Sequence, residues 1–310
     1  MYIYTAYNLC IYSEIELPEL FSAQGNPQVI VRRGRLDNIH PETTDGGNII
    51  LSPISFGVRF LIQNGCEITF DADSIVDEST IRALLLGFAM SLLLRQRGLL
   101  VLHGSSVVIN NGVVGFIGGS GWGKSTLAET FRTQGYPILT DDVMPIQTNT
   151  EYPLVMPSFP QIKLWPETAA VLGHDLEKLT QVIPNLPKLA HRFTDGFSQE
   201  SLPLKKIYIL AKGSNHEIIP LSPQIAVLEL IRHTRSTEWM TNIEFKKSNL
   251  QQCASLAKNV SISRFTRKPA LADLIQLVQL VQADLSNSIV KVSQNQPHLN
   301  TIFCGRSHKF

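Results

Sequence analysis

The sequence predicts an α/β fold in which a small, mainly antiparallel β domain precedes a larger α/β domain. Residues 1–76 contain short runs in which apolar and polar residues alternate, a pattern typical of strands with one buried face. After residue 98, short apolar runs alternate with helical patterns, which favours parallel strand pairing. We therefore expect the β domain at 1–76, the α/β domain at 77–285 and a polar tail at 286–310.

A hairpin is the clearest feature of the first domain. The runs 57–62 and 66–70 alternate in the same way on either side of Asn64 and Gly65. Both of these residues tolerate positive φ, so an Asn-Gly pair between alternating runs predicts a tight hairpin turn. A further strand-like run occupies 27–32.

One helix is expected to connect the two domains as a hinge. Apolar residues between 81 and 93 recur at intervals of three and four, the spacing of one helical face. Asp77 or Ser79 is in position to cap the start, and Gly98 follows the end. The run contains Arg82 and is shorter than the roughly 20 residues that a membrane span requires, so we expect a buried helix and no membrane partner.

Composition narrows the classes of partner. The 310 residues carry 27 basic and 26 acidic side chains, a formal charge of +1, which gives no reason to expect nucleic acid as a partner. Residues 1–7 lack the basic and apolar segments of a signal peptide, so we expect a cytoplasmic protein with reduced thiols. The cysteines form no CxxC pair, which argues against a cysteine-based zinc site; they are Cys10, Cys66, Cys253 and Cys304.

The second domain is expected to alternate strands and helices along the chain. The expected strands lie at 99–102, 107–109, 113–117, 137–140, 204–211 and 260–265. The expected helices lie at 124–134, 222–233, 249–259 and 270–285. Gly135 ends the first of these helices, and Ser222 caps the second.

A glycine-rich segment between the strand at 113–117 and the helix at 124–134 fits the pattern GxxxxGK[ST]. Strand, loop and helix in this order predict a phosphate-binding loop, with Lys124 on the β and γ phosphates and the hydroxyl of Ser125 on Mg²⁺. The alternative is a glycine-rich turn that binds nothing. The residues expected to contact the nucleotide are Gly118, Gly119, Ser120, Gly121, Trp122, Gly123, Lys124, Ser125 and Thr126.

An acidic pair follows 17 residues after this lysine, since 141 − 124 = 17. Asp141 and Asp142 end a short strand that we expect to return parallel to the first, so both carboxylates would face the phosphate crevice. One of them is then available for the metal and the other for an acceptor hydroxyl. The alternative is a solvated turn or a helix cap. His103 ends an earlier strand and is either a phosphate or carboxylate partner or a structural residue.

These pieces together resemble the catalytic domain of the HPr kinase/phosphorylase family, most closely over 99–145. The segment containing His103 lies 124 − 103 = 21 residues before the lysine, and the acidic pair follows it. The resemblance implies that Asp141 is the catalytic base, that Asp142 lies near the metal, and that His103 and Lys124 complete the catalytic set. The family's domain is also similar to ATP-dependent phosphoenolpyruvate carboxykinase, which implies a fold of that type.

The chain departs from true HPr kinases after Asp142. The segments 157–166, 188–193 and 203–210 look more like HPr-kinase-related proteins of peptide-modification gene clusters, including kinases that phosphorylate a serine of a lasso-peptide precursor. Lys163 and Arg192 are further candidates for binding phosphate, because phosphoryl transfer needs cations, or else they are surface charges. Arg232, Arg235 and Arg264 are weaker candidates of the same kind.

The expected function is therefore an ATP- and Mg²⁺-dependent serine kinase acting on a peptide or protein. A different class is also open: a nucleotide-binding regulatory or assembly protein with little turnover. Carboxykinase chemistry has no independent signal in the sequence. The preference for ATP over GTP and the formation of a homo-oligomer are left open.

Overall fold

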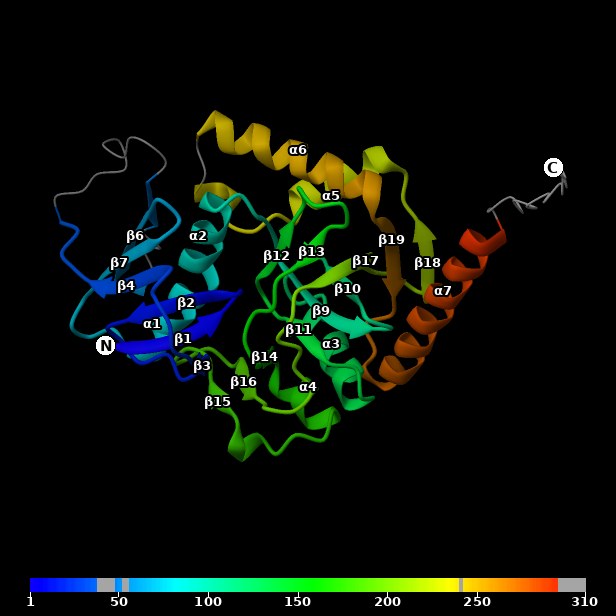
Figure 1. Ribbon diagram of the computed structural model, residues 1–310. Helices are drawn as coiled ribbons and strands as arrows, with labels where there is room; N and C mark the ends of the chain where they lie inside the picture. The colour runs from blue at the N-terminus through cyan, green and yellow to red at the C-terminus, as the bar shows by residue number, and fades with distance from the viewer. Residues whose placement is uncertain (38–47, 52–55, 240–241, 295–310) are drawn as a thin grey trace, which may run out of the picture.

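The computed structural model describes residues 1–37, 48–51, 56–239 and 242–294, which form a mixed α/β fold with several β-sheets (Figure 1). The N-terminal sheet and the strands that carry the predicted site lie side by side in this view. Within the described part of the chain, no helix combines the length and the apolar character needed to cross a membrane.

The N-terminal sheet has the strand order β3-β1-β2-β4-β7-β6-β5. The pairs β2–β4 and β4–β7 are parallel, and the other pairs are antiparallel. The predicted hairpin is confirmed, because Gln63 pairs with Glu67 and both Asn64 and Gly65 have positive φ. The strands are β1 (Tyr2–Ala6), β2 (Leu9–Ser13), β3 (Phe21–Ser22), β4 (Val29–Arg33), β5 (Ile49–Leu51), β6 (Val58–Gln63) and β7 (Glu67–Ala72).

The connecting helix is interrupted by one π-helical turn. It consists of α1 (Glu78–Leu84), the π turn η3 (Leu85–Ala89) and α2 (Met90–Gln96). Asp77 caps the start by accepting the backbone N–H of Ser79 at 2.8 Å. The buried face of this helix shares one hydrophobic core with the N-terminal sheet and with Val143 and Phe159 from the second part of the chain. The expected boundary at residue 76 therefore falls inside a continuous core.

The second large sheet has the order β11-β9-β10-β17-β13-β12-β8, with β19 also paired to β17 and β18 paired to β19. The pairs β10–β17 and β17–β19 are parallel. β11 runs parallel to β10 as predicted, but the antiparallel strand β9 lies between them. The strands are β8 (Leu100–Leu102), β9 (Gly104–Ile109), β10 (Gly112–Ile117), β11 (Ile138–Thr140), β12 (Met144–Gln147), β13 (Leu154–Val155), β17 (Leu202–Lys212), β18 (Glu217–Pro220) and β19 (Ser261–Arg267).

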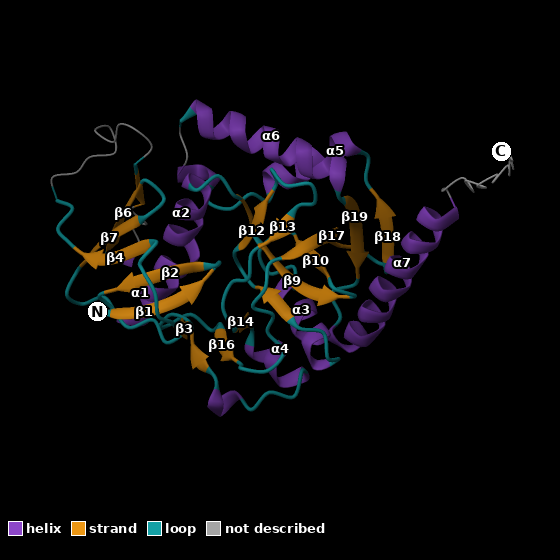
Figure 2. Ribbon diagram, viewed as in Figure 1, coloured by secondary structure: helices purple, strands orange, loops and turns teal. Residues whose placement is uncertain are grey.

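Helices cover both faces of this sheet (Figure 2). Alternation along β10 places Val114 and Phe116 against α3 and α7, and Val113 and Ile117 in the core beneath α5 and α6. The helices are α3 (Lys124–Thr133), α4 (Pro166–Val171), α5 (Pro223–Arg232), α6 (Ile243–Asn259) and α7 (Leu274–Gln294), with short 3₁₀ turns η4 (Leu176–Lys178), η5 (Thr237–Trp239) and η6 (Leu271–Asp273).

Two features differ from the sequence prediction. A small third sheet, in the order β14-β16-β15, was not expected; its strands are β14 (Gln161–Leu164), β15 (Thr180–Gln181) and β16 (Leu189–Arg192). The last helix continues to Gln294, so the first part of the predicted polar tail is helical, because apolar positions keep a helical spacing past 285. The rest of that tail, 295–310, lies outside the described residues.

Candidate functional site

Glycine shapes the loop between β10 and α3. Gly118 has a φ of 151°, and a Cβ at this position would lie 3.1 Å from the carbonyl oxygen of Leu210. Gly123 has a φ of 71° and immediately precedes α3. A residue with a side chain rarely adopts either conformation. The loop therefore runs directly into the N-terminus of α3, where unpaired N–H groups and the helix dipole favour an anion.

Lys124 is folded over this loop. Its ammonium group donates to the carbonyl oxygens of Gly118 at 3.0 Å and Gly119 at 3.1 Å, and the residue is only 6% exposed. Burial lowers the pKa of Lys124 to about 8, and the carboxylates of Asp141 and Asp142 oppose that shift. The amine thus lies on the loop that is predicted to bind phosphate.

Asp141 is buried at the end of β11 and is fully engaged by neighbouring donors. Its Oδ1 accepts hydrogen bonds from the hydroxyls of Ser105 at 2.6 Å and Ser125 at 2.8 Å. Its Oδ2 accepts the backbone N–H of Lys163 at 3.1 Å. The sequence pairs Ser125 with Asp142 as metal ligands, whereas in the structure the carboxylate that contacts Ser125 belongs to Asp141.

The Asp142 side chain has different partners from the Asp141 side chain. Its backbone is left-handed, with a φ of 69°, which turns the two carboxylates in different directions. Its carboxylate oxygens lie 2.9 Å from Nζ of Lys163 and 3.0 and 3.1 Å from the guanidinium of Arg235. Burial opposes ionisation, but the charges of Arg235 and Lys163 outweigh it and hold the pKa of Asp142 well below its usual value. Asp142 is therefore a carboxylate held between two cations.

His103 also lies beside Asp142, with Nε2 3.4 Å from Oδ1. It occupies the point where the chain passes from β8 to β9, and its backbone N–H donates to the carbonyl of His233 at 2.9 Å. Burial lowers the pKa of His103 to about 3, although the Asp142 carboxylate acts in the opposite direction. The imidazole is therefore neutral at pH 7 and contacts Asp142 as a dipole rather than as a cation.

The π turn of the connecting helix contacts Arg235, one of the two cations that pair with Asp142. Arg235 donates from Nε to the carbonyl of Gly87 at 3.4 Å, and its guanidinium lies 4.8 Å from the centre of the Phe88 ring. A Cβ on Gly87 would lie 3.2 Å from Nη2 of Arg235, so glycine permits this close approach. A segment predicted as a hinge thus forms part of the wall of the site.

Most of the predicted site residues meet around two adjoining hollows. The first is lined by His103, Ser120, Gly121, Gly123, Lys124, Ser125, Thr126, Asp141, Asp142, Lys163, Trp165 and Lys188. Gly118, Gly119 and Trp122 line the second, which has a volume of about 810 Å³. Arg232, Arg235 and Arg264 also line the second hollow.

Arg192 does not join this group. Its guanidinium pairs with Glu19 at 3.0 Å and its side chain is 41% exposed. It lines two other hollows, one of which also includes Lys163. The sequence leaves Arg192 open as a phosphate-binding candidate or a surface charge, and β16 carries it to the end of the small sheet away from Lys188. Its exposure and its pairing with Glu19 favour the surface charge.

Several residues of the site carried no clear signal in the sequence. Ser105 lies two positions after His103 and pairs with Asp141 only because β9 and β11 are neighbours. Arg235 is one of the weaker phosphate-binding candidates from the sequence, but its pairing with Asp142, 93 positions away, follows from no spacing rule. Trp165 and Lys188 line the first hollow, here called the cleft together with the second, from the ends of β14 and β16.

Comparison with known proteins adds little to this geometry. No protein-family model matches the chain, and no curated protein matches it. Among solved structures, a match covers 63% of this chain and 98% of the HPr(Ser) kinase/phosphatase from Coxiella burnetii, with a TM-score of 0.34 and 9% sequence identity. A TM-score this low assigns neither fold type nor function, so both have to be argued from the residues.

Proposed function

We propose that this chain is a Mg²⁺- and ATP-dependent kinase that transfers the γ-phosphate to a serine hydroxyl of a peptide or protein. The observation that carries the proposal is the hydrogen bond between Ser125 and Asp141. In nucleotide-binding proteins with such a loop, the hydroxyl after the lysine and an acidic residue at a strand end hold Mg²⁺ together. Asp141 and Ser125 are 2.8 Å apart and meet beside Lys124, which supports a shared metal position.

This proposal exchanges the roles that the sequence suggested for the acidic pair. Asp141 and Ser125 hold Mg²⁺, and Asp142 faces the acceptor. Lys163 and Arg235 already flank Asp142, and cations at this position neutralise charge on the transferred phosphoryl group. When the γ-phosphate binds, these two cations are shared between it and Asp142. The carboxylate then becomes basic enough to accept the hydroxyl proton.

One observation favours the alternative of a nucleotide-binding regulatory protein. Asp142 is already satisfied by two cations, and a carboxylate with a strongly lowered pKa is a weak base. A chain that keeps these ion pairs with nucleotide bound would bind Mg²⁺–ATP and transfer phosphate slowly.

The first experiment measures Mg²⁺–ATP binding by calorimetry. Lys124→Ala should abolish binding, because its amine lies on the loop. Arg192→Gln is the matched control: it also removes a cation, but one outside the cleft, so affinity should stay at the wild-type value. Wild-type affinity in Lys124→Ala would contradict the nucleotide assignment.

The second experiment measures phosphate transfer to an array of serine-containing peptides over a Mg²⁺ titration. Asp141→Asn should raise the Mg²⁺ concentration required for half-maximal transfer. Asp142→Asn should lower transfer by at least ~100-fold at saturating Mg²⁺, the low end for loss of a general base. If only Asp141→Asn lowers the rate at saturating Mg²⁺, the base is Asp141 instead. If the wild-type chain binds Mg²⁺–ATP and transfers to no peptide, the regulatory function is the better account.

A further inference from the structure

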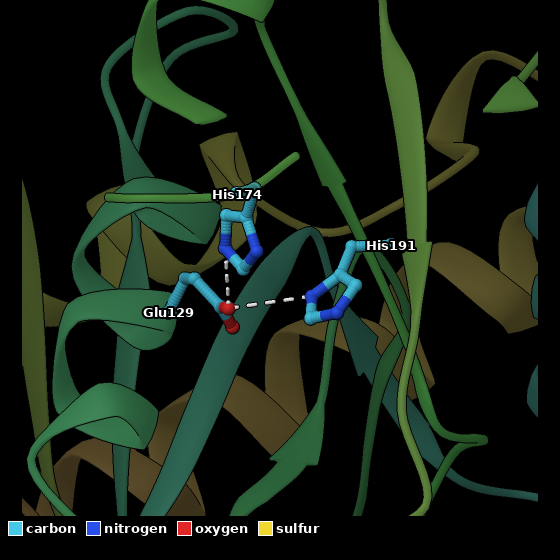
Figure 3. A group of neighbouring side chains, drawn as sticks. All are labelled: Glu129, His174 and His191. Carbon is cyan, nitrogen blue, oxygen red and sulfur yellow. Dashed lines mark ion pairs between the residues drawn. The ribbon is translucent and has the colours of Figure 1, made fainter. Parts of the chain in front are cut away.

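A second group of chemically reactive side chains lies outside the cleft (Figure 3). Glu129 is on α3, His174 follows α4, and His191 is on β16. Nε2 of His174 lies 2.8 Å and Nδ1 of His191 lies 3.3 Å from the same oxygen, Oε1 of Glu129. One possible ligand atom from each of the three residues lies within 4.8 Å of those of the other two. Three separate segments thus direct two imidazoles and one carboxylate to a single point.

Both imidazole nitrogens are buried and have the Glu129 carboxylate as their partner at ion-pair distance, although among the described residues neither contact has the angles of a regular hydrogen bond. Their rings lie 4.3 Å apart between centroids and are tilted by 52°. Two buried imidazoles that share one carboxylate oxygen at poor angles leave that oxygen and both nitrogens available to an ion placed between them.

The donor set and the spacing fit a transition metal. Two histidines and one glutamate are a known three-residue zinc set, with a fourth position for water. Bond lengths of about 2.0 Å to nitrogen and oxygen place tetrahedral ligands about 3.3 Å from one another. The separation of 3.3 Å between His191 and Oε1 equals this value, whereas His174 at 2.8 Å would have to move outward by about 0.5 Å to share an ion. Mg²⁺ prefers oxygen ligands, so the imidazoles select against it.

Arg132 is the residue that competes with a cation here. It donates from Nε to Oε2 of Glu129 at 2.8 Å and from Nη2 to Oε1 at 2.7 Å. Its guanidinium also lies 4.8 Å from the centre of the Phe193 ring, which holds it in place. A metal that takes Oε1 leaves the bond to Oε2 intact. Arg132 would then orient the ligating carboxylate from outside and weaken the metal's affinity through its charge.

We propose that Glu129, His174 and His191 form a binding site for one Zn²⁺ ion that fastens the small sheet to α3. His191 on β16 pairs with Ile162 on β14, and the next residue on β14 is Lys163, which lines the cleft. Glu129 lies on the helix that begins with Lys124. The ion would therefore hold β14, which carries Lys163, against α3, which begins with Lys124. Three protein ligands leave one position for water, unlike the closed four-ligand sites of purely structural zinc, so the ion would link the two elements without filling its coordination from protein alone. The site does not depend on the proposed kinase activity.

The test is a Zn²⁺ titration of the untagged, chelator-treated chain without nucleotide, followed by calorimetry and thermal unfolding. The wild-type chain should bind one equivalent and unfold at a higher temperature with Zn²⁺. Glu129→Gln and the double variant His174→Ala, His191→Ala should lose that equivalent and the shift. The matched control is His216→Ala, which removes a partly buried histidine that pairs with Asp273 at 2.9 Å, away from the proposed zinc site. This control should keep both the bound equivalent of Zn²⁺ and the rise in unfolding temperature.

Two further measurements keep the result interpretable if a variant folds poorly. Arg132→Gln keeps all three ligands, removes the guanidinium charge that repels a cation and leaves an amide beside Glu129, so this variant should still bind one equivalent of Zn²⁺. Co²⁺ added to the wild-type chain should give the absorption spectrum of a four-coordinate ion. Equal Zn²⁺ binding by the wild-type chain and the double variant, or an octahedral Co²⁺ spectrum, would overturn the proposal.

Discussion

The ion pair between Arg235 and Asp142 gives the most direct test of the site's architecture. Arg235→Met removes the guanidinium charge but keeps an unbranched side chain over Phe88. The substitution leaves Asp142 with Lys163 as its remaining cation within 3 Å. We expect the free energy of unfolding to fall by about 3 kcal/mol at pH 7, the low end for breaking a buried ion pair.

The magnitude follows from the contacts. Two unit charges about 4 Å apart attract each other by about 4 kcal/mol at an effective dielectric constant of about 20. The Asp142 side chain is 21% exposed and keeps Lys163, so the loss should be smaller than this. Asp142→Asn is a suitable partner substitution, because asparagine tolerates the left-handed backbone at this position. In that background Arg235→Met should cost only about 1 kcal/mol, the value of its hydrogen bond to Gly87.

The assay is urea denaturation of the wild-type chain, both single variants and the double variant. The expected coupling energy is about 2 kcal/mol, within the range for residues in direct contact. Arg232→Met is the matched control, since Arg232 is 70% exposed and should cost less than about 0.5 kcal/mol. If the two substitutions in the cluster add without coupling, the ion pair does not stabilise this site and the electrostatic account of Asp142 is wrong.

Three other predictions concern the core, the loop and a buried thiol. Phe70→Ala should cost about 3–5 kcal/mol and keep one unfolding transition, because the N-terminal sheet shares its core with the rest; two denaturant transitions would favour independent domains. Gly118→Ala should weaken Mg²⁺–ATP binding by at least ~10-fold in calorimetry, since strain at such a backbone costs about 1–3 kcal/mol, and unchanged affinity would refute the loop argument. Burial raises the pKa of Cys253 to about 11, so the folded chain holds the thiol proton more tightly than the unfolded chain does. The stability that the neutral thiol contributes is therefore complete below pH 9 and is lost as the pH rises through 11. The stability gap between wild type and Cys253→Ala should therefore narrow between pH 8 and 10.5, and a constant gap would contradict this.

The sequence by itself determined the features that depend on near neighbours. The turn at Asn64 and Gly65, the cap at Asp77, and the glycine-rich loop between β10 and α3 are all found where the pattern predicts them. Each is set by backbone preferences or by hydrogen bonds within a few residues, and such interactions are encoded by residue type and short spacing. The sequence also predicted that Lys124 and Asp141 lie close together, because only one helix and one short strand separate them along the chain.

Only the tertiary structure decided which distant residues meet. β9 lies between β10 and β11, and this insertion brings Ser105 onto Asp141. Arg235 reaches Asp142 across 93 positions, and Glu129 meets two histidines from other segments. Periodicity states that a strand or helix has a buried face, but not which element covers it. That choice depends on how all the apolar faces are buried at once, and it determined which carboxylate faces Ser125.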